Sequence, residues 1–298
     1  MKLYQYRIYE LIIQSELELP DLLEDYSSQA DVVIKYGEVP SELTNPKSQG
    51  VLYEANREEF IFRFPKIGSF SVKRGSEIII QPADSANPSE IRVFLLGSVM
   101  GALLHQREIF PIHGSTINTS KGAVIISGRS CTGKSTLAAA FYKAGFEVIA
   151  DDVSVIKSNF DGGFIVVPGI PYLKLWKDSL DELGINGKLE RVRDDIEKYK
   201  LPLSGVSPLK SHVVKKVIIL SIKNSSGIQH CEIRGSEKFA ILRNNSYRAQ
   251  FIYGLDQTES HFEMLSNLSR TIKLIRVERP SSPFLIDDLL HYIIEKII

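Results

Sequence analysis

Alternating hydrophobic and polar positions dominate the first part of the chain and predict β-strands there. Each run is rich in β-branched or aromatic residues, and turn-forming residues separate one run from the next. The runs are 4–13, 31–36, 60–64 and 77–81. We therefore expect residues 1–86 to form a β-rich N-terminal region.

A helix signal follows this region. Asn87 is a suitable N-cap, Pro88 suits the first helical position, and Glu90 can complete a capping box. Residues 91–104 are apolar on most faces, which is typical of a helix buried between layers. The pattern predicts a buried connecting helix over residues 87–107.

From Ile112 onward, short apolar runs alternate with helix-favouring stretches, which predicts a mixed α/β domain over residues 108–298. The expected strands are 112–117, 123–127, 147–156, 163–167, 213–222 and 271–277. The expected helices are 135–144, 236–244, 259–269 and 284–297. Residues 177–200 are charged and are expected to be helix or loop.

The strongest chemical signal lies between the expected strand 123–127 and the expected helix 135–144. The segment reads Gly128-Arg129-Ser130-Cys131-Thr132-Gly133-Lys134-Ser135 and continues with Thr136. It matches G-x-x-x-x-G-K-[ST], in which glycines let backbone N–H groups converge on phosphate and the helix dipole favours the anion. Lys134 can reach the outer phosphates, and the Ser135 hydroxyl can bind Mg²⁺. We expect residues 128–136 to bind ATP with Mg²⁺; a Gly-rich turn and a non-catalytic nucleotide site are the alternatives.

The amino-acid composition narrows the classes of protein that remain possible. The 298 residues hold 36 Lys+Arg and 36 Asp+Glu, which argues against broad capture of nucleic acid or of an anionic membrane. Two cysteines are too few for a disulfide framework, so a reducing compartment is expected. The first residues lack the apolar core of a signal peptide, and no apolar run approaches a membrane span. These features predict a cytoplasmic protein.

A pair of carboxylates interrupts the apolar run 147–156. Asp151 and Asp152 follow Lys134 by about 17 residues, so the next strand along the chain brings them toward the phosphate loop. One carboxylate can support Mg²⁺ beside Ser135, and the other can accept a proton from an attacking hydroxyl. A structural pair of aspartates in a turn is the alternative. His113 precedes the phosphate-loop strand by one hairpin and can orient an aspartate, or it is an ordinary strand residue.

Three segments in this order resemble the catalytic domain of HPr kinase/phosphorylase, which shares its nucleotide-binding core with ATP-dependent phosphoenolpyruvate carboxykinase. They are Ile112-His113-Gly114-Ser115, the phosphate loop and Ile149-Ala150-Asp151-Asp152-Val153. The resemblance implies an α/β P-loop core of that type, preceded by the β-rich region. It implies that Lys134 contacts the β- and γ-phosphates, that Ser135 and Asp151 bind the metal, and that Asp152 is the base with His113 close by. Homo-oligomers are a further implication, since HPr kinases assemble as hexamers.

The N-terminal segment 6–17 and the segment Pro168–Trp176 resemble a divergent branch of HPr-kinase-like proteins. Some of its members resemble kinases that phosphorylate a serine of a lasso-peptide precursor. The Arg-Gly-rich downstream segment of HPr kinases has only a loose counterpart in 238–248, which argues against phosphorylase activity. Pro168–Trp176 is either a loop with an apolar anchor or a wall of the active site.

The sequence thus predicts an ATP- and Mg²⁺-dependent kinase that acts on a serine of a peptide or protein. Two alternatives stay open: a kinase for free serine or a sugar-like hydroxyl, and a non-catalytic nucleotide-binding regulatory protein.

Overall fold

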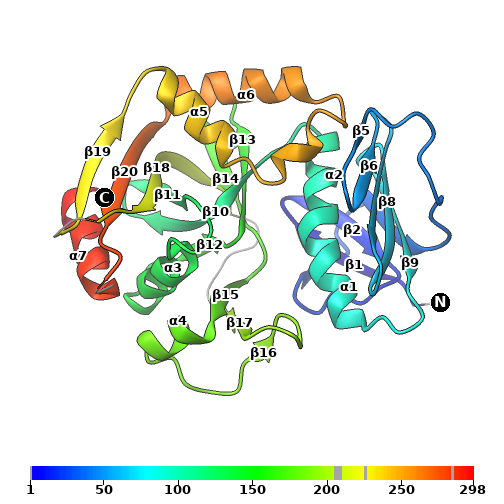
Figure 1. Cartoon of the computed structure of the whole chain (residues 1–298), viewed down its shortest axis with the longest axis horizontal. Coiled ribbons are helices and arrows are strands. Elements are labelled where there is room, and N and C mark those ends of the chain that lie inside the picture. Colours follow the sequence, from blue (N-terminus) through cyan, green and yellow to red (C-terminus); the bar gives the residue numbers. More distant parts are fainter. Residues whose placement is uncertain (1, 205–209, 225–226, 283–284) are drawn as a thin grey trace. The chain divides into compact units, whose positions relative to one another are not determined.

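The structure is a computed structural model that describes residues 2–204, 210–224, 227–282 and 285–298. The chain forms two compact units (Figure 1). One comprises Met1–Pro111 and Tyr247–Met264, and the other comprises Ile112–Ser246 and Leu265–Ile298. Helices accompany extended sheets throughout, so the expected mixed α/β class is confirmed. The finer assignment to an HPr kinase type of core stays a prediction.

The first unit is built on a sheet whose described strands run in the order β3-β1-β2-β4-β9-β8-β7-β6-β5. Their bounds are β1 (Tyr4–Ile8), β2 (Leu11–Ser15), β3 (Leu23–Glu24), β4 (Val32–Tyr36), β5 (Ser48–Gln49), β6 (Tyr53–Ala55), β7 (Glu59–Phe64), β8 (Gly68–Lys73) and β9 (Glu77–Pro82). The β-rich pattern of the sequence is therefore correct for this region. The run 4–13 is two strands rather than one, because Tyr9 and Glu10 form a turn with φ of 54° and 62°.

The expected helix 87–107 is present as three consecutive segments: α1 (Pro88–Phe94), the π-helical η1 (Leu95–Val99) and α2 (Met100–Gln106). The Asn87 side chain accepts a hydrogen bond from the Ser89 N–H, as an N-cap should. Residues 247–264 join this unit through the 3₁₀ turn η2 (Ala249–Phe251), since the Phe251 ring lies 4.5 Å from that of Phe60. An aromatic contact between distant residues leaves no local pattern, so the sequence does not reveal this grouping.

The second unit holds a sheet whose described strands run in the order β11-β10-β13-β14-β18-β20-β19, with β12 paired to β10. A further parallel pairing joins β11 to β18, so β11, β10, β13, β14 and β18 close into a ring. The bounds are β10 (Phe110–Thr119), β11 (Gly122–Ser127), β12 (Val148–Ala150), β13 (Val153–Ser158), β14 (Phe164–Val167), β18 (His212–Ile222), β19 (Gln229–Ile233) and β20 (Lys273–Arg279).

A smaller sheet, β15-β17-β16, and several helices complete this part of the chain. The bounds are β15 (Tyr172–Trp176), β16 (Glu190–Arg191), β17 (Lys198–Pro202), α3 (Lys134–Lys143), α4 (Lys177–Glu182), α5 (Ser236–Asn244), α6 (Thr258–Thr271) and α7 (Ile286–Lys296). The core of the second unit joins α3 and α7 to the sheet. One cluster of buried hydrophobic residues includes Phe141 of α3, Ile293 of α7, and Leu173 and Leu175 of β15.

Three expectations differ from the structure. The run 147–156 is two strands, β12 and β13, because Asp151 and Asp152 form a turn between them. Residues 177–200 contain strands as well as a helix, since their pairing with β15 is not visible in the local pattern. The expected helix 284–297 corresponds to α7, which begins at Ile286; residue 284 lies outside the described residues. None of the described helices is long and apolar enough to cross a membrane.

Candidate active site

The phosphate loop joins the end of β11 to the start of α3, as the motif requires. Gly128 has φ of 139°, and a Cβ at this position would lie 2.3 Å from the Leu220 carbonyl oxygen, so only glycine fits. Cys131 and Gly133 also have positive φ, of 63° and 98°. This sequence of left-handed residues curls the backbone between the strand and the helix N-terminus, which is the geometry of an anion-binding nest.

Lys134 is the first residue of α3 and is buried. Its Nζ donates hydrogen bonds to the carbonyl oxygens of Gly128, at 3.0 Å, and of Arg129, at 2.9 Å. Burial lowers the pKa of this ammonium, while Asp151 and Asp152 oppose that effect. The side chain therefore lies across the phosphate loop, with its charge beside the two aspartates.

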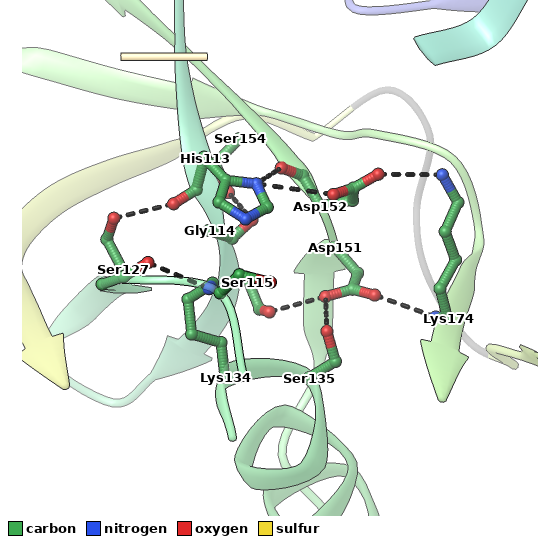
Figure 2. Close-up of polar contacts among 12 residues, drawn as sticks. His113, Gly114, Ser115, Ser127, Lys134, Ser135, Asp151, Asp152, Ser154 and Lys174 are labelled. Atoms are coloured by element: carbon green, nitrogen blue, oxygen red, sulfur yellow. Dashed lines mark hydrogen bonds and ion pairs between the residues drawn. The ribbon is translucent and has the colours of Figure 1, made fainter. Parts of the chain in front are cut away.

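Asp151 directly follows β12 and is held by three donors (Figure 2). Ser115 Oγ donates to its Oδ1 at 2.6 Å, and Ser135 Oγ donates to the same oxygen at 2.9 Å. The Lys174 backbone N–H donates to its Oδ2 at 2.9 Å. Asp151 is thus fixed directly beside the serine of the phosphate loop.

Asp152 has different partners, although it is the next residue. Its φ is 68°, a left-handed conformation that costs energy in a non-glycine residue and turns the side chain away from that of Asp151. Lys174 Nζ donates to its Oδ2 at 2.9 Å, and His113 Nδ1 lies 3.4 Å from its Oδ1. Burial opposes ionisation, but the charge and hydrogen bond of Lys174, together with the neighbouring His113, outweigh it and lower the pKa of this carboxyl well below its ordinary value.

His113 lies on β10, the strand that pairs with β11. Its Nδ1 donates to the Asp152 carbonyl oxygen at 3.0 Å, and Ser127 Oγ donates to the His113 carbonyl oxygen at 2.7 Å. Burial lowers the pKa of this imidazole, so the neutral form is favoured near pH 7. The neighbouring Gly114 permits close strand contact, because a Cβ there would lie 2.6 Å from the Ile126 carbonyl oxygen.

The antiparallel strand pair β15–β17 forms another wall of the same site. Alternation along β15 buries Leu173 and Leu175 in the core and leaves Lys174 and Trp176 on the opposite face. Lys198 of β17 pairs with Trp176 in register, and its Nζ lies 5.6 Å from the centre of the indole ring. Lys174, Trp176 and Lys198 line a cleft of about 600 Å³ together with the phosphate loop.

Two further contacts tie the phosphate loop to its surroundings. Thr136 Oγ1 lies 2.8 Å from Ser179 Oγ, which links the first turn of α3 to α4. Arg279, the last residue of β20, is buried and donates from Nε to the Thr132 carbonyl oxygen at 3.1 Å. Both contacts hold the loop from the side of the cleft, and the Arg279 guanidinium adds a positive charge to its lining.

The structure therefore brings the residues expected from the sequence into one site. The cleft is lined by His113, Ser130, Cys131, Gly133, Lys134, Ser135, Thr136 and Asp152, while Gly128, Arg129, Thr132 and Asp151 support it from behind through the contacts above. The residues that sequence reasoning did not assign are Ser115, Lys174, Lys198 and Arg279. Alternation in 172–176 is a signal that could have revealed Lys174; the other three depend on strand pairing.

The oxygen atoms beside the phosphate loop fit a magnesium ion. Mg²⁺ in phosphoryl-transfer sites typically has one or two protein oxygens, and phosphates and water supply the rest. Ser135 and Asp151 are such a pair, since their side-chain oxygens lie 2.9 Å apart. Among the described residues there is no group of three or more His, Cys, Asp or Glu that could hold a metal.

Comparison with known proteins finds similarity among solved structures. No protein-family model and no curated protein matches the chain. Among solved structures, the HPr(Ser) kinase/phosphatase from Coxiella burnetii is 14% identical; the alignment covers 62% of this chain and 95% of the other, with a TM-score of 0.32.

Proposed function

We propose that this protein is an ATP- and Mg²⁺-dependent kinase that transfers the γ-phosphoryl group to a hydroxyl. The observation that supports this best is the separation of roles between adjacent aspartates. Asp151 contacts Ser135 of the phosphate loop, whereas Asp152 lies in the cleft beside His113 and Lys174. A site that only binds nucleotide needs the first arrangement and not the second.

The binding part of the mechanism follows from the phosphate loop. Its curled backbone and the α3 N-terminus receive the β- and γ-phosphates, and Lys134 supplies a positive charge to them. Ser135 and Asp151 would hold Mg²⁺, which neutralises phosphate charge when it is bound. Arg279, fixed against Thr132, adds a further positive charge from the cleft lining.

In the transfer step, the acceptor oxygen forms a bond to the γ-phosphorus while the bond from that phosphorus to the β–γ bridging oxygen breaks. ADP leaves with that oxygen, and the acceptor proton passes to the Asp152 carboxylate. Asp152 is ionised before the acceptor arrives, because Lys174 and His113 lower its pKa. The His113 Nδ1–H holds the Asp152 backbone, so it positions the base and takes no part in the proton transfer.

The acceptor we propose is a serine of a peptide or protein, such as a biosynthetic precursor peptide. This choice comes from the resemblance of the three ordered segments, and the contacts of the site agree equally with any primary hydroxyl. Free serine and a sugar-like alcohol are therefore the competing acceptors in the experiment.

The test is incubation with Mg²⁺ and γ-labelled ATP, in the presence of serine-containing peptides, free serine or simple sugars, followed by mass spectrometry. Transfer to a peptide serine that is lost in Asp152→Asn supports the proposal. Transfer only to a small alcohol would replace the acceptor class. Tight ATP binding without turnover across all acceptors would contradict the kinase assignment and favour a regulatory nucleotide-binding protein.

A further inference from the structure

Trp176 is the most unusual residue of the cleft that the phosphoryl-transfer chemistry does not use. It is the only tryptophan in the 298 residues, and about half of its side chain (48%) is exposed. It lines the same cleft as Lys134, Ser135 and Thr136. A large aromatic side chain that is left partly exposed beside a phosphate site offers a flat apolar surface to whatever the phosphates belong to.

The position of Trp176 relative to the phosphate loop is set by α4. Trp176 is the N-cap residue of this helix, and Ser179 in its first turn contacts Thr136 at 2.8 Å. Three residues of helix correspond to a rise of about 4.5 Å. Trp176 therefore lies within a short span of the residue that follows the phosphate-loop serine.

The neighbours of the indole also indicate a ligand with both an aromatic ring and negative charge. Lys198 is fixed by strand register opposite Trp176, with its Nζ 5.6 Å from the ring centre. This charge also helps to lower the pKa of Lys134, so its field reaches the phosphate loop. Asp178, two residues after Trp176, lines the cleft and offers a carboxylate to hydroxyl or amino groups.

We propose that Trp176 is the stacking surface for the base of the donor nucleotide, with Asp178 as a polar contact for its ribose or base. The proposal rests on the function above in that it assumes a nucleotide in the phosphate loop. It extends that function by assigning the nucleoside part of the site, which the motif does not specify. Base–aromatic stacking of this kind typically changes affinity by about tenfold to a hundredfold.

The experiment compares ATP with inorganic triphosphate, which offers phosphates without a base. Calorimetry measures both affinities in the wild type, Trp176→Ala and Trp176→Phe, with Mg²⁺ present throughout. We expect Trp176→Ala to weaken ATP about tenfold or more and to leave triphosphate unchanged, and Trp176→Phe to retain most of the ATP affinity. Phe160→Ala is the matched control, because Phe160 is a fully exposed aromatic residue that does not line the cleft.

The intrinsic fluorescence of the single tryptophan gives a second readout in the unmodified protein. ATP and ADP should quench it, and triphosphate should not. Equal ATP affinity in the wild type and Trp176→Ala would overturn the proposal, as would equal quenching by triphosphate or a response only to an acceptor peptide. These measurements need no turnover, so failure of the kinase assignment and failure of the stacking site are separate outcomes.

Discussion

The phosphate loop and the strand pair β15–β17 line the same cleft, but they are constructed differently. The loop depends on its backbone: Gly128, Cys131 and Gly133 have positive φ, which curls the chain between β11 and α3. The strand pair depends on side chains that alternate along β15, with Lys174 and Trp176 facing the cleft. Backbone conformation therefore limits which substitutions the phosphate loop, the first wall of the cleft, can accept. In the strand pair, the second wall, side-chain chemistry sets that limit.

The largest effect on activity is expected at Lys134, the charged residue of the phosphate loop. Lys134→Ala should reduce phosphoryl transfer by about a thousandfold or more, because it removes a cation from the transferring phosphates. Labelled-phosphate assays at saturating ATP check this. Lys143→Ala, on the same helix but outside the cleft lining, should keep wild-type activity. Equal losses in the two variants would mean that helix stability, not phosphate binding, is being measured.

The next largest effect is expected at Asp152, which lines the cleft beside the phosphate loop and Lys174. Asp152→Asn should lower kcat by about a thousandfold while ATP still binds, because the amide cannot accept the acceptor proton. Rapid-quench measurement of the transfer step, with calorimetry for ATP, separates the two quantities. Asp181→Asn, an exposed carboxylate outside the cleft lining, is the control. Full activity in Asp152→Asn would remove the base assignment.

The contribution of the second wall to catalysis is tested at Lys174 of β15. Lys174→Met should lower kcat by about a hundredfold, since it removes an ion pair from a largely buried carboxylate, and Lys174→Arg should restore part of the rate. The charge of Lys174 lowers the pKa of Asp152, so its loss raises that pKa and protonates the base at a higher pH. The acidic limb of the kcat–pH profile should therefore move to higher pH in Lys174→Met, and an unmoved limb would contradict this coupling.

The smallest effect concerns the free energy of unfolding and tests whether the phosphate loop depends on its backbone conformation. Gly128→Ala should cost about 2 kcal/mol or more of unfolding free energy, because it combines strain at φ of 139° with a Cβ 2.3 Å from the Leu220 oxygen. Gly145→Ala, at φ of 88° with no atom within 4 Å of its Cβ, should cost only about 1 kcal/mol. Urea unfolding of both variants checks the difference. Equal costs would mean that the close approach does not matter.

The same contrast explains how much the sequence revealed. The phosphate loop was predictable, because its glycines, Lys134 and Ser135 are contiguous and the flanking strand and helix have clear patterns. Asp151 and Asp152 were also visible, as charged residues inside an apolar run. The prediction that Asp152 lies near His113 is met in the geometry, at 3.4 Å between Nδ1 and Oδ1.

Other features depend on pairing between distant segments. Ser115 reaches Asp151 because β10 carries it there, and Arg279 reaches Thr132 because β20 lies beside β18. Ser115 stands in the segment Ile112-His113-Gly114-Ser115, but nothing in that segment indicates its contact with Asp151, and Arg279 belongs to no local motif. The catalytic roles, ATP, Mg²⁺ and the acceptor stay predictions, because they concern molecules that bind to the protein rather than contacts within it.

The alternation along β15 has a consequence for how such a protein can diversify. Leu173 and Leu175 attach β15 to the hydrophobic core, while Lys174 and Trp176 line the cleft. A single residue inserted within β15 would exchange the core-facing and cleft-facing side chains. The length of this strand is therefore the property that evolution constrains most strictly.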